Sequence, residues 1–215
     1  MVGLPRVSGR VGRARSVTLV RVMEDFVKVY LHEDLRWVRR SLLSKVEGLS
    51  EYDARRPLTK TGTNLLGLIK HLALCEARYF GEIFGRPYPE RLPRFDDPGF
   101  VNREHMWVTE QESRDDVITG YERAWRHADA TIEALLIDAP GYVPWWPQPE
   151  VRLFNVMVHV LTESNRHAGH ADILREQLDG AVGAGMATMS ESDEADWAAH
   201  RSRIEKAARA AGSGT

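Results

Sequence analysis

The sequence predicts an all-α protein folded as a four-helix bundle. Four long stretches repeat their apolar residues every three or four positions, which is typical of amphipathic helices. The connection between the first two stretches is short, and the connection between the second and the third is long. No stretch shows the alternation of a strand, a glycine-rich phosphate loop or an internal repeat, and 215 residues suit one domain.

The first helix is predicted from about Thr18 to Glu47, as one long helix or as two. Gly48 follows it as a C-terminal stop. Charged residues fill the side of this helix opposite its apolar face. The apolar face comprises Val22, Phe26, Val29, Tyr30, Val38, Leu42, Leu43 and Val46.

Residues 1–16 are predicted to form a disordered basic tail. They carry Arg6, Arg10, Arg13 and Arg15, but no apolar run follows, so the pattern is not that of a secretory signal. A translation start placed too far upstream is the alternative interpretation of the same segment.

A short helix and a second long helix follow. Ser50-Glu-Tyr-Asp53 is a capping box that opens the short helix, and Pro57 ends it. Thr61-Gly-Thr63 is expected to cap the second long helix, which runs to about Phe84. His71 lies among the apolar positions of this helix, so we expect its side chain at or near the core.

Two irregular segments flank the third long helix. Residues 86–112 contain four prolines, and connections longer than about 15 residues are often functional lids or crossovers. Ser113-Arg-Asp-Asp116 is a second capping box and opens a helix that reaches about Leu135. Residues 138–150 contain the adjacent pair Trp145-Trp146, which we expect to fold back over another part of the chain.

The fourth helix is predicted from about Val151 to Leu178. Its first half is apolar nearly all round, as in a central buried helix. Residues 181–215 are predicted to be a flexible link and a surface helix anchored by Trp197 and Ile204. The bundle is therefore expected within residues 17–180.

The composition restricts the function. A net charge of −2 gives no argument for nucleic-acid binding, and no apolar run approaches the roughly 18 residues of a membrane span. Cys75 is the single cysteine, which excludes an internal disulfide and a cysteine-rich zinc site and suits a reducing compartment. We expect a cytoplasmic protein that acts on a small molecule, without a nucleic-acid or membrane partner.

The fourth helix carries the main functional signal. Glu163 and His167 lie one turn apart, His170 follows about three quarters of a turn later, and His159 lies one turn upstream. Burying such a group is costly unless it is paired, and a divalent metal ion would pair with it. Glu163 and His167 supply two ligands, and His71 on the second helix is the natural third. Two histidines and a carboxylate with an open position suit catalytic zinc and also iron(II).

Structural roles stay open for several of these residues. His71 taken alone fits a hydrogen-bonded core histidine, and Cys75 fits a small buried hydrophobic residue better than a site residue. The Trp145-Trp146 pair fits the core and a pocket wall equally well. Three further histidines are expected on the surface or in loops: His105, His127 and His200.

Three segments in combination resemble the DinB-like superfamily. They are Thr61-Gly-Thr-Asn-Leu-Leu-Gly-Leu-Ile-Lys-His71-Leu-Ala, Pro144-Trp-Trp, and Glu163-x-x-x-His167-Ala-Gly-His-Ala-Asp-Ile-Leu-Arg-Glu176. More narrowly, they resemble its uncharacterised actinobacterial branch, which is related to mycothiol-dependent maleylpyruvate isomerase and thiol transferases. The likeness covers roughly residues 25 to 205.

The resemblance implies an up-down-down-up bundle with a long second crossover. It implies His71, Glu163 and His167 as metal ligands, with zinc as the first choice of metal and nickel or iron as alternatives. The family pattern is His-x-x-x-His-x-Gly-Gln, and this chain has Glu163 for the first histidine and His170 for the glutamine. A glutamate ligand also occurs in the isomerase relatives, so the site is retained. His170 is the candidate catalytic residue, and the roles of fourth ligand, outer group and proton shuttle stay open for it.

The implied activity is metal-dependent transfer of mycothiol or a similar low-molecular-weight thiol to an electrophile, or thiol-assisted isomerisation. His159 shares the candidate role in proton transfer. Arg166 and Arg175 flank the motif and suit substrate carboxylates, although a surface ion pair is the simpler role for each. A metal-dependent hydrolase and a non-catalytic, stress-related or structural bundle are the competing functions. A homodimer is the simplest oligomer.

Overall fold

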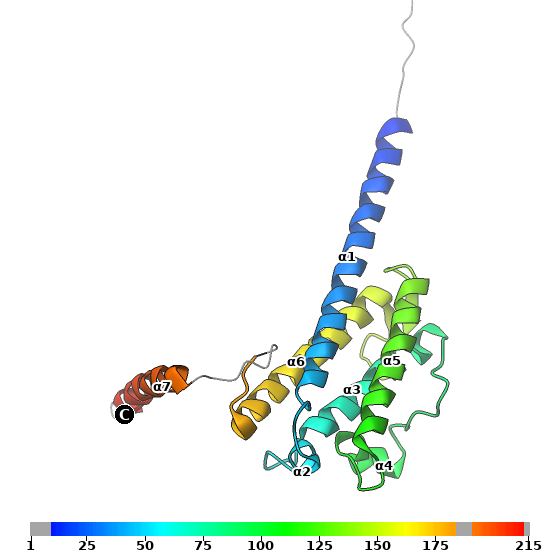
Figure 1. Ribbon diagram of the computed structural model, residues 1–215. Coiled ribbons are helices and arrows are strands. Elements are labelled where there is room, and N and C mark those ends of the chain that lie inside the picture. The colour runs from blue at the N-terminus through cyan, green and yellow to red at the C-terminus, as the bar shows by residue number, and fades with distance from the viewer. Residues whose placement is uncertain (1–9, 184–190, 213–215) are drawn as a thin grey trace, which may run out of the picture.

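Four long helices form the body of the protein in the computed structural model (Figure 1). The structure describes residues 10–183 and 191–212. The bundle helices are α1 (Arg10–Ser44), α3 (Leu65–Tyr79), α5 (Arg114–Ala134) and α6 (Leu153–Asp179). The all-α prediction is confirmed.

Contacts near the helix ends fix the directions of the helices. Arg114 at the start of α5 donates hydrogen bonds to the carbonyls of Val46 and Leu49, just beyond the end of α1, so these two helices are antiparallel. Arg175 near the end of α6 donates to the carbonyl of Lys45, so α6 runs in the same direction as α1. Helices α3 and α5 run the opposite way, side by side, which gives the expected up-down-down-up order (Figure 1).

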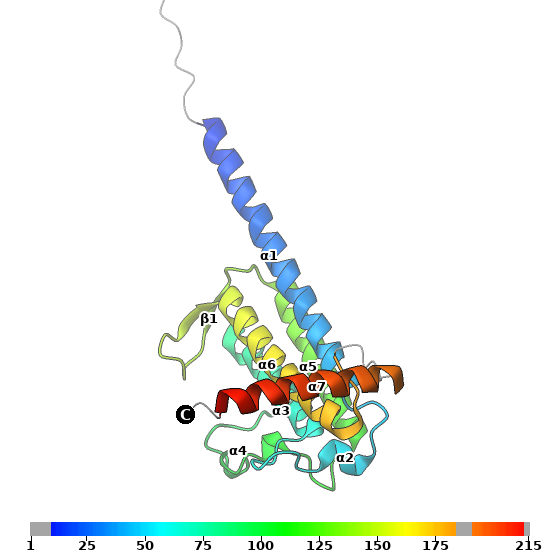
Figure 2. The same ribbon diagram turned by 90° about the vertical axis from the view of Figure 1, so that its left-hand side faces the viewer.

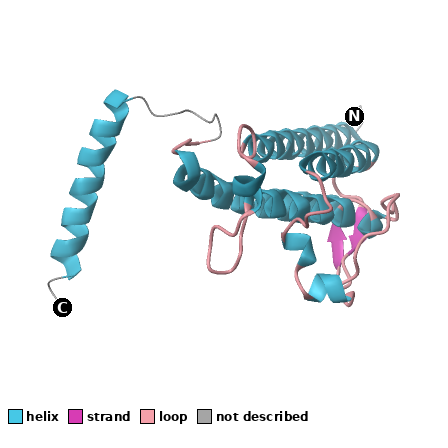
Figure 3. Cartoon of the chain, turned by 60° about the horizontal axis from the view of Figure 1, so that its bottom comes forward, coloured by secondary structure: helices cyan, strands magenta, loops and turns pink. Residues whose placement is uncertain are grey.

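Short elements occupy the connections. Helix α2 (Glu51–Arg55) begins at the predicted cap Ser50, and the long crossover contains η1 (Glu82–Phe84), α4 (Pro98–Val101) and η2 (Glu104–Met106). The third connection is an antiparallel hairpin of β1 (Pro140–Tyr142) and β2 (Glu150–Arg152), shown in magenta in Figure 3. The expectation of no strands is therefore corrected. Three-residue strands are too short to show an alternating pattern in the sequence.

The starts of two long helices differ from the predicted ones. Helix α1 begins at Arg10, so residues 10–16 of the expected tail are helical, and residues 1–9 lie outside the described part of the chain. The cap of α3 is Asn64 rather than the Thr61-Gly-Thr63 segment, and its side chain accepts a hydrogen bond of 2.7 Å from the Gly67 amide. The second capping box, at Ser113, is formed as predicted.

The first half of α1 extends beyond the bundle (Figures 1 and 2). Four of the residues predicted for its buried face are exposed for this reason: Val22, Phe26, Val29 and Tyr30. The later residues of the same face, Val38, Leu42 and Val46, are buried in the core. Periodicity therefore identified the correct face, but it does not indicate where the bundle stops covering it.

A buried ion pair fixes α3 against α1. The Nε of Arg39 donates to Oε1 of Glu76 at 2.9 Å, and a second hydrogen bond joins Nη2 to Oε2. Nη1 of Arg39 also donates to Asp129 of α5 at 2.6 Å. Because these charges are buried, each needs its partners in place. These ion pairs thus fix which faces of α1, α3 and α5 pack against one another.

Helix α7 (Glu191–Gly212) is drawn apart from the bundle in Figures 1 and 3. Its predicted anchors Trp197 and Ile204 are both exposed. Most of the expected flexible link, residues 184–190, lies outside the described part of the chain. None of the described helices is both long and apolar enough to cross a membrane.

Candidate metal site and substrate pocket

Helices α3 and α6 bring the three predicted ligands together. His167 Nε2 lies 3.0 Å from Oε1 of Glu163, one turn earlier on α6. His71 Nε2, from α3, lies 3.6 Å from the same carboxylate oxygen. The rings of His71 and His167 meet edge to face, with centroids 5.0 Å apart.

These distances fit a tetrahedral metal ion. The three residues each offer a ligand atom, and these atoms lie within 4.8 Å of one another. Two ligands bound at about 2.1 Å in tetrahedral geometry lie about 3.4 Å apart, and the two measured distances of 3.0 and 3.6 Å lie on either side of that value. Nδ1 of His71 is buried without a hydrogen-bond partner among the described residues. A chemically suitable set of two imidazoles and one carboxylate is therefore present.

The protonation states also suit a cation. Burial lowers the pKa of His71 to about 4, and the neighbouring His167 and His105 add to the effect. Burial likewise lowers the pKa of His167 against the opposing charge of Glu163. The pKa of Glu163 is lowered because the adjacent histidines outweigh its partial burial. At neutral pH the group has neutral imidazoles and an ionised carboxylate, which are the forms that bind metals.

The other two histidines of α6 occupy different positions. His170 is exposed, and its Nδ1 lies 3.3 Å from Nδ1 of His167, so one ring can donate a hydrogen bond to the other. His159 is half-buried and lines the pocket next to Glu163. Burial lowers the pKa of His159, which favours its neutral form. His159 thus lines the pocket, whereas His170 contacts His167 at Nδ1, the ring nitrogen that does not face Glu163.

The two adjacent tryptophans close one side of the site. Both Trp145 and Trp146 donate their indole N–H to the hydroxyl of Tyr79, at 3.3 and 3.2 Å. The His159 ring lies 4.7 Å from the rings of both Tyr79 and Trp146. The expectation that the tryptophans fold back over another part of the chain is confirmed, and Trp145 serves as a pocket wall.

A cavity of about 230 Å³ opens over His71 and Glu163. Cys75, one turn after His71, lies at its wall, with Sγ 3.5 Å from Nε2 of His71. Burial raises the pKa of this thiol to about 12, and the nearby carboxylates of Glu163 and Glu76 add to the effect. Cys75 therefore stays protonated at neutral pH and is a poor nucleophile.

The long crossover supplies residues that the sequence did not indicate. The ring of His105 lies 5.5 Å from that of His71 and stacks on Phe100 at 4.2 Å. No spacing rule could have placed His105 here, because it lies on an irregular segment. Asn64 donates to the carbonyl of Met106 at 3.4 Å and helps hold this segment against α3.

Arg78 of α3 is a further pocket residue that sequence reasoning missed. It follows His71 by seven positions, so the two residues lie on one face of the helix, and this spacing is a signal that could have identified it. The two arginines that the sequence favoured have other partners. Arg166 is exposed and pairs with Glu163 at 3.3 Å, and Arg175 pairs with Asp179 at 2.7 Å.

Comparison with known proteins gives a family. A family model described as mycothiol-S-transferase matches residues 30–180, which is more than half of the chain. No curated protein matches the chain significantly. The matched range contains the four bundle helices from the middle of α1 to the end of α6, including the whole site. The chain therefore belongs to the mycothiol S-transferase family, within the DinB-like helical bundles.

Proposed function

We propose that this protein transfers a low-molecular-weight thiol of the mycothiol type to a small electrophile in a metal-dependent reaction. One observation carries the proposal: His71, Glu163 and His167 place three ligand atoms within 4.8 Å of one another, beside a pocket lined by His71 and Glu163, in a chain of a thiol-transferase family. When bound, a divalent ion such as zinc favours the thiolate form of a thiol near neutral pH.

The reaction needs an acceptor for the thiol proton. His159 is the best-placed residue for it, because it lines the pocket and its lowered pKa leaves the ring neutral at pH 7. The thiol sulfur then attacks an electrophilic carbon, a carbon–sulfur bond forms, and the leaving group departs with its electron pair. In a conjugate addition no group leaves: the sulfur bonds to one carbon of the activated double bond, and the other carbon takes up a proton.

His170 contributes through His167 in this scheme. The contact between the two Nδ1 atoms fixes the orientation of the His167 ring and directs Nε2 towards Glu163. The direct catalytic role predicted for His170 stays a prediction, and its exposed position favours the orienting role.

Cys75 is a poor candidate for the nucleophile, because the pKa of its thiol is about 12 and the side chain is only partly exposed. The attacking sulfur must therefore come from a second substrate. A larger cavity of about 600 Å³ also borders α3 and shares the wall residues Leu74 and Phe100 with the smaller one. It offers room for the part of the thiol that does not react.

The test is thiol-dependent turnover of a neutral chromogenic electrophile, 1-chloro-2,4-dinitrobenzene, by the purified protein with mycothiol. Formation of the thioether should need the thiol, stop on treatment with a chelator and return on adding zinc. His167→Ala should abolish it. His127→Ala removes a histidine whose Nε2 contacts the Arg86 carbonyl outside the site, and it should leave the rate unchanged. Turnover of the electrophile without any thiol would contradict the proposal and favour a hydrolase.

A further inference from the structure

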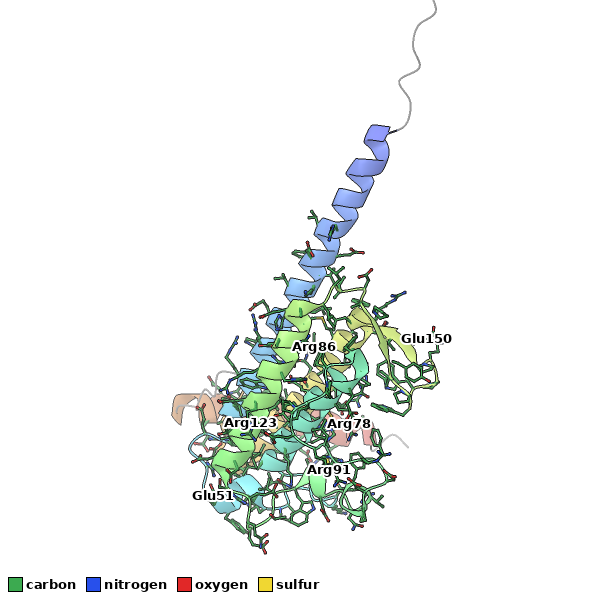
Figure 4. All side chains as sticks on the ribbon, turned by 90° about the vertical axis from the view of Figure 1, so that its right-hand side faces the viewer. Glu51, Arg78, Arg86, Arg91, Arg123 and Glu150 are labelled. Atoms are coloured by element: carbon green, nitrogen blue, oxygen red, sulfur yellow. The ribbon has the colours of Figure 1, made fainter. Side chains whose placement is uncertain are left out.

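Arg78 is a charged residue buried beside the site, with 7% of its surface exposed. It lines the smaller cavity together with Glu163 and His159. Figure 4 labels Arg78 on α3, together with Arg91 of the crossover and Arg123 of α5. Because burying a guanidinium group is costly, the partners of Arg78 determine what the residue does.

The known contacts of Arg78 are aromatic rings and one carbonyl. Its guanidinium carbon lies 4.3 Å from the centre of the Phe95 ring and 5.7 Å from that of Phe100. Nη2 donates a hydrogen bond to the carbonyl of Pro93. Within residues 21–183 and 194–212, where side chains are described, no carboxylate lies within 4.0 Å of it. Glu82 and Asp97 act on it only at longer range.

The other buried arginines of the bundle are paired with acids. Arg39 contacts Glu76 and Asp129, and Arg175 contacts Asp179. Arg78 differs from them because its remaining N–H donors have no acid partner among the side chains that the structure describes. An arginine fork with free donors at the edge of a cavity is suited to bind a planar anion in two hydrogen bonds.

The charges of the pocket support an anionic ligand. Among the described residues, Glu163 is the one acid that lines the cavity, and Arg78 adds a positive charge to it. With a divalent ion bound, the pocket would have two positive charges in excess. A thiolate neutralises one of them, and an anionic group on the second substrate would neutralise the other.

We infer that Arg78 binds a carboxylate of the electrophilic substrate and makes this protein selective for small anionic electrophiles. The inference deepens the proposed function and rests on it. The pocket walls contributed by Phe95, Tyr79 and Trp145 favour a flat unsaturated or aromatic body next to the carboxylate. Arg78 is a specificity residue in this scheme, while the thiol chemistry belongs to the His71, Glu163 and His167 cluster.

The test uses two ligands of the same shape, trans-cinnamate and trans-cinnamamide, and calorimetry of the protein as purified and after chelation. The wild-type protein should bind cinnamate about 10- to 100-fold more tightly than the amide in both forms, the range expected for hydrogen bonds to a charged group. Arg78→Met should bind both ligands equally. Arg78→Lys should keep a smaller preference for the carboxylate.

Arg91→Met is the matched control. Arg91 is an exposed arginine of the crossover that lines the larger cavity and not the smaller one, and its removal should leave the cinnamate preference unchanged. Unchanged affinity for cinnamamide in Arg78→Met shows that the pocket is still formed. If that affinity also falls, Arg78→Lys decides: a remaining carboxylate preference supports the inference, and equal binding overturns it.

Equal binding of both ligands by the wild-type protein would overturn the inference, and so would a cinnamate preference that persists in Arg78→Met. A loss of the cinnamate preference in Arg91→Met as large as in Arg78→Met would also overturn it. Measurement on the chelated protein separates this inference from the proposed function. A preference that depends on Arg78 without metal, in a protein that transfers no thiol, would leave the anion site standing and contradict the transferase. Thiol transfer without a carboxylate preference would support the transferase and contradict the anion site at Arg78.

Discussion

Oε1 of Glu163 lies 3.6 Å from Nε2 of His71, although the two residues belong to different helices. Glu163 also contacts His167 on its own helix at 3.0 Å, so one carboxylate joins both histidines of the cluster. Only the folded bundle brings α3 and α6 together in this way. Metal binding at this site should therefore stabilise the folded state.

The first prediction concerns metal content. Elemental analysis of the native protein should find one divalent ion per chain, and the double variant His71→Ala, His167→Ala should bind none. A free metal concentration about 100 times the dissociation constant should raise the free energy of unfolding by about 2.7 kcal/mol in the wild-type protein. The double variant His127→Ala, His200→Ala, with both histidines outside the site, should behave like the wild type. Equal metal in the two double variants would refute the ligand assignment.

The second prediction concerns Cys75. Because the pKa of its thiol is about 12 and the side chain is only partly exposed, the native protein should react with Ellman's reagent far more slowly than the urea-unfolded chain at about pH 8. Cys75→Ala should retain thiol transfer to 1-chloro-2,4-dinitrobenzene. Rapid modification of the native thiol, with loss of activity in Cys75→Ala, would instead make Cys75 a nucleophile.

The third prediction concerns pH. The pKa of His71 is about 4 in the folded protein and about 6.5 in an unfolded chain, so the unfolded chain takes up a proton first as the pH falls. The stabilising contribution of neutral His71 is present above about pH 6.5 and is lost between about pH 6.5 and about pH 4. Between about pH 7.5 and pH 5, the metal-free wild type should lose about 2 kcal/mol more than His71→Gln in urea unfolding. The control His127→Gln should lose as much as the wild type.

The fourth prediction concerns the buried ion pair of α1 and α3. Arg39→Met leaves the fully buried Glu76 without its main partner and should lower the free energy of unfolding by about 3–5 kcal/mol. The double variant Arg39→Met, Glu76→Leu should recover more than half of the loss, because no unpaired carboxylate remains. Arg126→Met, which breaks an exposed pair with Glu122, should change stability by less than about 1 kcal/mol. Urea unfolding of the four proteins measures all these differences.

The fifth prediction concerns the contact between α3 and the crossover. A Cβ at Gly67 would lie 2.0 Å from the carbonyl oxygen of Met106, so the segment that holds His105 would have to move. Gly67→Ala should therefore destabilise the protein by about 1–3 kcal/mol despite the better helix propensity of alanine. Gly120→Ala in α5 meets nothing closer than a flexible Arg123 atom at 3.8 Å, and it should stabilise the helix by up to about 1 kcal/mol. Equal melting temperatures for the two variants would contradict the tight contact.

The helices and their order could be predicted because local patterns determine them. Apolar residues at helical spacing identified all four long helices, and Ser50 and Ser113 marked two of the starts. Asn64 escaped notice because a threonine-rich segment before it offered an equally good cap. The exposed face of α1 at Phe26 escaped notice because coverage by other helices is a long-range property.

The candidate site was predictable in part for the same reason. Glu163 and His167 lie on one turn, so spacing alone paired them, and the apolar surroundings of His71 indicated the second helix. His105 comes from an irregular crossover, where no periodicity relates position to direction. Arg78 has a helical spacing to His71, but the sequence could not show that the acids near it stay out of reach.

The hydrogen bonds from Trp145 and Trp146 to Tyr79 have a practical consequence. Both indole rings lie at the edge of the site, and indole emission responds to the polarity and charge around the ring. Occupancy of the pocket should therefore be visible as a change in the intrinsic fluorescence of the unlabelled protein. Tyr79→Phe removes the shared acceptor and keeps the aromatic wall, which identifies the part of the signal that comes from this pair. The fluorescence of these two tryptophans can thus be used to follow binding at the proposed substrate site without a label.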